Sequence, residues 1–322
     1  MIKLYSLFFL YFLISAILAL LIDEIAGEPG NRYHPVAWLG HLIGFLDRRL
    51  HSISDSVISG TVLLVTILLI SLSATFVVMW LAALNILVWI VAGAVIFKIT
   101  FASRSMSDHI IPVVKYLKSS DTDSARKSLS MMVRRETAGL SESLICSACI
   151  ETISEGYVDG FLSPVFYFGI LGVMGAVAAR VINTLDSMVG YRNQRYLKFG
   201  RASARADTFI NFIPARLSYI IFMLSSPIRS GTLRPGKIRD EARLTESINA
   251  GWPMSTMAFI LGVRLEKEGS YVLNKYGRES GIEDVMRALR IFQLSVLAGM
   301  ALALLIAFII QALILSYAGL FF

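Results

Sequence analysis

Long uncharged stretches dominate the chain and define most of the elements we expect. Residues 4–22 carry no charge and, as a helix, would be roughly 28 Å long, about one hydrocarbon thickness. Residues 56–97 are also uncharged and long enough for two spans joined by a tight turn near Asn85, which predicts a helical hairpin. Residues 291–322 predict a further span. Asp23 follows the first stretch without a small-residue cleavage pattern, so we expect a retained span.

Two other apolar stretches are interrupted by residues that lipid-facing helices rarely tolerate. Residues 160–179 contain one proline and several glycines and lead directly into Arg180, and residues 209–228 contain Pro214 and Arg216. An arginine at the centre of a lipid-facing helix costs about 2.5–3.5 kcal/mol. We therefore expect both stretches to face protein or a wet cavity, as broken or re-entrant segments. Residues 247–263 form a shorter uncharged piece that contains Pro253.

The polar segments complete the predicted architecture. Residues 36–50 have apolar positions at helical spacing with charge on the opposite face, which predicts an interfacial helix after a turn-rich loop. Residues 98–160 are soluble in character and form the largest extramembrane segment. The prediction is an all-α polytopic membrane bundle with four to six spanning segments, re-entrant or broken helices and a helical cytoplasmic segment. We expect one domain, with parts at 1–97, 98–160, 161–290 and 291–322.

Composition and charge support a membrane protein and suggest its orientation. The 322 residues are 56% hydrophobic with a mean hydropathy of +0.67, outside the balance of a soluble domain. The net charge of +7 comes without a recognisable nucleic-acid-binding module, so no nucleic acid is expected. If only residues 4–22, the hairpin and the last stretch cross, all but one of the 30 lysines and arginines lie on one side. The positive-inside rule makes that side the cytoplasm.

A second topology, in which the stretches at 160 and 209 also cross, would move residues 180–208 to the far side. We favour the first topology because it keeps every candidate site residue on one face. It predicts a multi-pass protein of the cell membrane with its active site facing the cytoplasm.

Acidic residues at regular spacing suggest a metal site. Glu151, Glu155 and Asp159 recur every four residues, so on one helix they form a single stripe, and magnesium prefers such oxygen ligands. The alternative is an exposed acidic face. Asn183 and Asp186 add oxygen ligands three residues apart at a helix end.

Basic residues are concentrated in residues 180–216, which is either a charged loop that fixes topology or part of a site. The guanidinium groups of arginines in this stretch, and that of Arg135, could form bidentate hydrogen bonds with phosphate groups. His34 lies in a loop beside Glu28, where it is either polar surface or a proton shuttle. Cys146 and Cys149 lack a second ligand pair and are interpreted as packing residues.

Several motifs, in this order, resemble the adenosylcobinamide-phosphate synthase (CbiB/CobD) family of cobalamin biosynthesis. They are GEPGNRYHPVAWLG, RRETAGL, the Glu151–Gly160 stretch, NTLDSMVGYRNQRYLKFG, ADTFINFIPARL and NAGWPM. The resemblance covers nearly the whole chain. It departs from the family pattern at Glu136, Gly156 and the residues from Thr245 to Ile248, where the family usually has Asp, Asn and His-Pro-Ser-Pro.

The resemblance implies an integral membrane enzyme that joins adenosylcobyric acid to aminopropanol or its O-phosphate, with ATP as co-substrate and Mg²⁺ as cofactor. The alternatives are a membrane transporter and a membrane scaffold for corrinoid enzymes. The implied partners are these substrates, the lipid bilayer, further copies of the chain and other corrinoid-pathway enzymes. The catalytic candidates are His34, Glu155 and Asp186; the metal candidates are Glu151, Glu155, Asp159 and Asp186; the substrate or phosphate candidates are Arg135, Asn183, Arg192, Arg205, Asp207, Asn211, Arg216 and Asn249.

Overall fold

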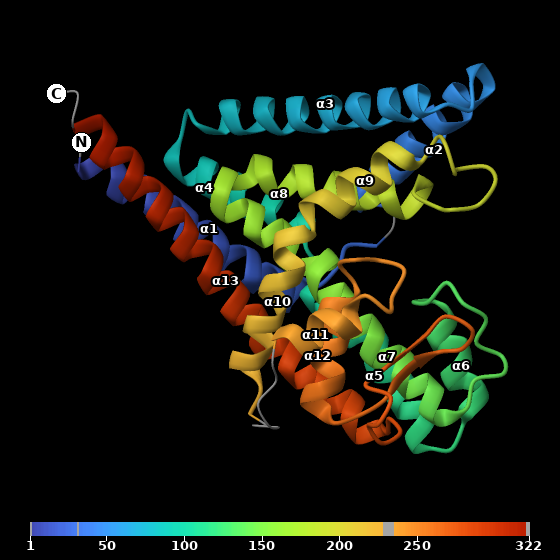
Figure 1. Ribbon diagram of the computed structural model, residues 1–322. Helices are drawn as coiled ribbons and strands as arrows, with labels where there is room; N and C mark the ends of the chain where they lie inside the picture. The colour runs from blue at the N-terminus through green and yellow to red at the C-terminus, as the bar shows by residue number, and fades with distance from the viewer. Residues whose placement is uncertain (1, 31, 228–234, 320–322) are drawn as a thin grey trace. The chain divides into compact units, whose positions relative to one another are not determined.

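The structure is a computed structural model that describes residues 2–30, 32–227 and 235–319. It is almost entirely helical (Figure 1), which confirms the predicted all-α class. Among the described residues, six helical segments are long and apolar enough to cross a membrane, within the predicted four to six. They are Phe9–Ala26, Val57–Ala82, Ile86–Lys118, Glu142–Val189, Arg201–Ser225 and Ile282–Ile314.

The chain forms two compact units, where the sequence predicted one domain with four parts. Unit 1 comprises Met1–Ala102, Ser163–Ile210 and Gly299–Phe322, and unit 2 comprises Ser103–Leu162 and Asn211–Ala298. Unit 1 contains α1 (Ile2–Ala26), α2 (Pro35–Ile53), α3 (Val57–Ala82), α4 (Ile86–Thr100), α8 (Ser163–Val189), α9 (Arg201–Ile210) and the later part of α13 (Ile282–Gly319). Unit 2 contains α5 (Ser103–Lys118), α6 (Thr122–Ser130), α7 (Glu142–Tyr157), the π-helix η1 (Val158–Leu162), α10 (Phe212–Ser225), α11 (Pro235–Ala242), α12 (Gly251–Leu261), β1 (Leu265–Lys267), β2 (Tyr271–Leu273) and the start of α13.

The helical hairpin in unit 1 has the predicted turn. Helix α3 ends at Ala82, and the Asn85 side chain caps α4 by accepting hydrogen bonds from the backbone N–H groups of Leu87 (2.9 Å) and Val88 (3.2 Å). An asparagine cap satisfies donors that the first helical turn leaves unpaired. The predicted hairpin between residues 56 and 97 is therefore confirmed.

Helix α8 is broken, as the sequence predicted for the stretch that begins at residue 160. Gly172 has φ 64° and ψ −152°, in a region that residues with a side chain rarely enter. Directly before α8, Val158–Leu162 forms a π-helical turn. The prediction that Glu151, Glu155 and Asp159 lie on one helix is therefore wrong for Asp159. Glu151 and Glu155 lie on α7, whereas Asp159 lies in the π turn.

The hydrophobic core of unit 1 joins the consecutive helices α2 and α3 to α8, which is far from them in sequence. Helix α3 runs alongside α8 (Figure 1). Buried side chains of α2, α3 and α8 meet at Phe199, in the loop that follows α8. They are Ile43, Leu63, Ile67, Val181, Leu185 and Val189. The apolar positions on these helices are thus buried by one another, while much of the outer face of α3 stays exposed.

In unit 2 the core is aromatic. The Tyr157 ring contacts the rings of Phe161, Phe222 and Phe292, and its hydroxyl donates to the Ser295 carbonyl over 2.7 Å. A short antiparallel hairpin, β1–β2, lies on α7, and the sequence reading missed it. Its strands have three residues each, too few to show a period-two pattern.

A glycine in α3 permits the close approach of the Phe199 loop. A Cβ on Gly60 would lie 1.7 Å from the Phe199 carbonyl oxygen, whereas a Cβ on Gly44 in α2 would lie 3.7 Å from the nearest side-chain atom. We expect Gly60→Ala to destabilise the protein by roughly 1–3 kcal/mol through overpacking, and Gly44→Ala to be neutral or stabilising. Thermal unfolding in detergent would measure both, and equal melting temperatures would contradict this packing.

Candidate functional site

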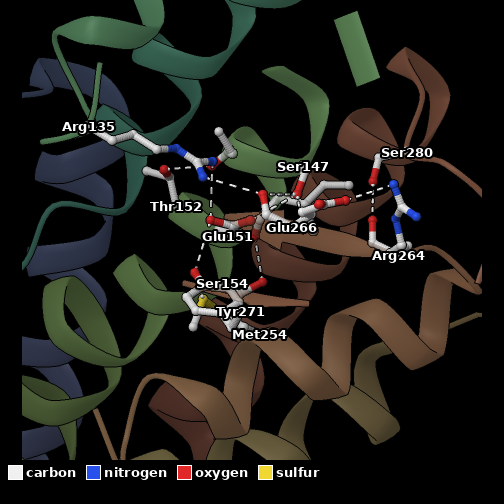
Figure 2. A network of polar contacts seen from close by, with 12 residues as sticks. Arg135, Ser147, Glu151, Thr152, Ser154, Met254, Arg264, Glu266, Tyr271 and Ser280 are labelled. Atoms are coloured by element: carbon white, nitrogen blue, oxygen red, sulfur yellow. Dashed lines mark hydrogen bonds and ion pairs between the residues drawn. The ribbon is translucent and has the colours of Figure 1, made fainter. Parts of the chain in front are cut away.

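A buried carboxylate, Glu151 of α7, is the centre of a polar cluster in unit 2 (Figure 2). One of its oxygens accepts from the Ser147 hydroxyl at 2.9 Å. The other accepts from the Arg135 guanidinium at 3.3 Å and from the Tyr271 hydroxyl at 3.1 Å. The cluster extends to the backbone of Glu266 in β1, which accepts from Arg135 and donates to Ser147.

This cluster keeps the Tyr271 hydroxyl protonated. Burial, and then the neighbouring Glu151 carboxylate, raise the pKa of the Tyr271 hydroxyl far above its usual value, so that Tyr271 remains a donor. Arg135 and Tyr271 supply donors to the same carboxylate oxygen. A magnesium ion at Glu151 would have to displace a guanidinium of like charge. In this arrangement Glu151 is a partner for Arg135 and the β1–β2 hairpin rather than an open metal ligand.

The other predicted metal ligands are distributed over both units. Glu155 is exposed on α7, Asp159 is half-buried in η1, and Asp186 lies in unit 1. No group of three or more His, Cys, Asp or Glu side chains that could hold a metal ion occurs within the described parts of the chain. Magnesium commonly needs only one or two carboxylates when substrate phosphates supply further oxygens, and single carboxylates such as Asp186 fit that arrangement.

A second cluster in unit 2 brings together two predicted substrate-binding residues. The Arg216 guanidinium donates to the Asn249 side-chain oxygen at 2.7 Å and to the Phe212 carbonyl at 2.8 Å. It also lies 3.6 Å from the centre of the Phe212 ring and 5.3 Å from that of Trp252. These contacts fix the orientation of the Arg216 guanidinium. A guanidinium with a fixed orientation can form the bidentate hydrogen bonds by which phosphate or carboxylate groups are recognised.

Unit 1 contains a strongly basic cavity of about 510 Å³ between the end of α8 and the start of α9. Its lining includes the predicted residues Arg192 and Arg205, together with Lys198 and Arg201, and none of the described lining residues is acidic. The backbone N–H groups of the first turn of α9 add partial positive charge at this end. The cavity is suited to a polyanion.

Asp186 lies at the edge of this cavity. A Cβ on Gly190, which lines the cavity, would lie 1.9 Å from the Asp186 carboxylate, so the carboxylate contacts the Gly190 backbone. Asn183 is one turn earlier on α8, at the helix end that the sequence predicted. The structure therefore places a carboxylate at the edge of the basic cavity, whereas Glu151 and Glu155 belong to the other unit.

His34 belongs to an ionic cluster at the ends of α1 and α4. Its Nδ1 accepts from the Val36 backbone N–H at 3.1 Å, so Nε2 carries the proton and donates to Glu28 at 2.7 Å. Glu28 and the buried Asp23 both pair with Lys98, at 2.6 and 3.2 Å. Both ring nitrogens are thus engaged, and the predicted base role would require one of these bonds to open.

The sequence reading missed a cluster around Asp47, which is 6% exposed on α2. Its oxygens accept from His51 (2.8 Å), Tyr196 (3.0 Å) and Arg195 (3.2 Å). Burial, and then the bond to Asp47, raise the pKa of Tyr196. Tyr196 lines the basic cavity, so Asp47 positions the loop that forms it. An aspartate on the inner face of an amphipathic helix was the signal that could have revealed this role.

The two remaining predicted residues flank the junction of α9 and α10. Asp207 is half-buried on α9 in unit 1. Asn211 is 1% exposed at the start of α10, and neither polar atom of its side chain has a hydrogen-bond partner among the described residues. A buried amide in that state is unusual, which marks Asn211 for mutational study.

Two departures from the family pattern have local structural explanations. A Cβ on Gly156 would lie 2.4 Å from the end of the Met106 side chain, so Met106 fills space that a larger residue would take. Thr245 donates to the carbonyls of Ala242 (2.9 Å) and Ser247 (2.8 Å) and stabilises the turn before Asn249. Glu136 is exposed, and nothing in the structure explains the change there.

The fold and these clusters define a helical, multi-pass membrane protein that carries buried ion pairs and a polyanion-type cavity. The family described as CobD/Cbib protein matches residues 16–294. The chain therefore belongs to the CobD/CbiB family of cobalamin biosynthesis, and the resemblance drawn from its motifs is confirmed.

Curated relatives support this assignment over most of their length. A "Probable cobalamin biosynthesis protein CobD" of Thermoplasma acidophilum is 39% identical over 278 residues, which cover 86% of this chain and 91% of the relative. The protein of the same name from Thermoplasma volcanium is 37% identical and covers 92% and 98%. A "Cobalamin biosynthesis protein CobD" of Dehalococcoides mccartyi is 37% identical and covers 81% and 86%. No solved structure matches the chain.

The Arg135–Glu151 pair can be tested with a double-mutant cycle. We expect Arg135→Gln to cost about 3–5 kcal/mol, because it leaves a buried carboxylate without its cation, and a coupling energy of about 0.5–3 kcal/mol with Glu151→Gln. Unfolding in mixed micelles would measure the three variants. Strictly additive effects would mean that the two side chains do not interact.

The anchoring role of Asp47 can be tested by limited proteolysis of the cavity loop. Asp47→Asn removes the charge that holds Tyr196 and Arg195, a loss of about 1.5–3 kcal/mol for charged hydrogen bonds, so trypsin should cleave after Arg192 and Arg195 several-fold faster. Asp55→Asn is the matched control, because Asp55 is 46% exposed and only 3.7 Å from His51. Equal cleavage rates in the two variants would contradict the proposed anchor.

Proposed function

We propose that this protein forms an amide bond in an ATP-dependent reaction. Adenosylcobyric acid supplies the carboxylate, and aminopropanol or its O-phosphate supplies the amine, to give adenosylcobinamide or its phosphate. Family membership supports a role in cobalamin biosynthesis. The motif resemblance supplies the particular reaction, as a carbon–nitrogen ligase.

The observation that carries this proposal is the basic cavity of unit 1. Four cationic side chains around about 510 Å³, with the Asp186 carboxylate at the edge, suit a triphosphate accompanied by magnesium. The cavity lies within NTLDSMVGYRNQRYLKFG and the start of α9, which is the most family-specific part of the chain. This role requires the cavity to open to the cytoplasm, where ATP is available.

The chemistry requires an activated carboxylate, because a carboxylate and an ammonium ion do not condense in water. In the acyl-phosphate route the carboxylate oxygen attacks the γ-phosphorus of ATP and ADP leaves. The amine nitrogen then attacks the carbonyl carbon, the C–O bond to phosphate breaks, and the ammonium protons are released to a base and to solvent. The adenylate route differs in releasing pyrophosphate in the first step and AMP in the second.

The residues present can supply the remaining roles. Arg192 and Arg205 would stabilise the charge on the transferring phosphoryl group. Magnesium, when bound, would screen the phosphates beside Asp186. The preorganised Arg216–Asn249 pair would bind the phosphate of the amine substrate or a corrinoid carboxylate. Glu155 is solvent-exposed on α7 and would act as the base, whereas a base role for His34 would require one of its two hydrogen bonds to open.

The reaction can be tested directly with purified protein in detergent. Adenosylcobyric acid, ATP, magnesium and either aminopropanol or its phosphate should give an amide product, with ADP if the intermediate is an acyl phosphate and AMP if it is an adenylate. Omission of magnesium should abolish product formation. Absence of product with any amine would favour the transport alternative instead.

Three variants test the assignment of roles within the cavity. Asp186→Asn and Arg205→Gln should each lower kcat/KM for ATP by about 10²–10³-fold, the usual cost of one electrostatic contact to a transition state. Arg239→Gln is the control, because Arg239 is an exposed arginine of α11 outside the cavity lining. Full activity in either cavity variant would remove that residue from the site.

A further inference from the structure

A second cavity in unit 1 has a different character from the basic one. It encloses about 420 Å³ between α2, α3, α4 and α8, within the range of about 300–1,000 Å³ typical of ligand pockets. Among the described residues that line it, Arg180 alone is ionisable, and three others carry a hydroxyl. The remaining described lining side chains are apolar, among them Trp38, Ala74 and Val78.

Three of the four helices that line this cavity, α3, α4 and α8, belong to segments that can cross a membrane. Ser71, Thr75 and Val78 come from α3, and Ile96 and Ile99 from α4, both apolar enough to span. Val78 is 47% exposed, so part of the wall continues onto the outer apolar face of α3. Such a face contacts acyl chains when the helix lies in a bilayer. The cavity is therefore accessible to lipid.

Part of the cavity lining has the character of a membrane interface. Trp38 belongs to the amphipathic helix α2, is 55% exposed, and donates its indole N–H to the Arg32 carbonyl at 2.9 Å. Tryptophan is enriched at the headgroup level of membranes, and amphipathic helices lie there. Lys98 and Thr100 place the polar end of α4 in the same region of unit 1.

Arg180 supplies the charge that an anionic headgroup requires. A guanidinium carries five N–H donors, so it can serve a protein acceptor and a phosphate together. Free inorganic phosphate would fit poorly, because the apolar walls would stay in contact with water. A molecule with a long apolar chain and one anionic group matches both parts of the lining.

We propose that this cavity binds an acyl chain of an anionic phospholipid from the surrounding bilayer, with the lipid phosphate at Arg180. The bound lipid would fill the space between α3 and α8 beside the core of unit 1. The proposal concerns a site separate from the basic cavity, and it does not depend on the ligase reaction.

Lipid retention tests the proposal without an activity assay. The protein is purified in mild detergent, offered an equimolar mixture of phosphatidylglycerol and phosphatidylcholine, washed, and analysed by native mass spectrometry. Wild type should retain one phospholipid per chain, with phosphatidylglycerol preferred. Ala74→Trp, which fills the cavity, should lower retention several-fold. Leu69→Trp, on the same helix but outside the lining and 61% exposed, should retain lipid as wild type does.

A variant of the residue proposed to bind the lipid headgroup keeps the proposal testable if Ala74→Trp does not fold. Arg180→Gln should retain lipid but lose the preference for phosphatidylglycerol by about five-fold, the equivalent of roughly 1 kcal/mol for one basic residue. Equal retention by Ala74→Trp and Leu69→Trp, or an unchanged headgroup preference in Arg180→Gln, would overturn the proposal. Displacement of the lipid by inorganic phosphate alone would also overturn it and identify free phosphate as the ligand.

Discussion

Buried charge is the constraint on which the rest of this structure depends. Asp23, Asp47 and Glu151 are among the carboxylates that are more than nine-tenths buried in this mostly apolar chain. A buried ion without a partner is very costly, so each faces a cation and, for the last two, hydroxyl donors as well. The pairs connect segments that are distant in sequence: α1 with α4, α2 with the loop before α9, and α7 with the β1–β2 hairpin.

These connections explain why the motifs of the family lie where they do. Most of the loop of residues 191–198 is exposed, yet Asp47 and His51 hold it against α2, so its arginines and Tyr196 keep a defined cavity. Arg135 is held by Glu151 in the same way, and Arg216 by Asn249. Positioned cations of this kind lose little conformational entropy when an anion binds. The polar residues of the chain thus act mainly by orienting one another.

Much of the fold could be predicted because apolar spans leave a strong signal. The hairpin with its turn at Asn85, the amphipathic α2 and the broken α8 all follow from charge spacing, glycines and an asparagine cap. The acidic stripe failed because a π turn at Val158–Leu162 changes the helical phase, which four-residue spacing cannot reveal. The β1–β2 hairpin was missed because three-residue strands carry no measurable period.

The sequence by itself determined the class of protein, its family and the residue types available for phosphate, carboxylate and metal chemistry. The length of an apolar stretch and the residues of a motif are local properties of the chain, so both can be recognised from the sequence alone. Only the tertiary structure decided which charges meet: that Arg216 pairs with Asn249, that Glu151 is occupied by Arg135, and that Asp186 borders a basic cavity. Pairing depends on distances between segments remote in sequence, because charge interactions are selected by burial and geometry rather than by spacing.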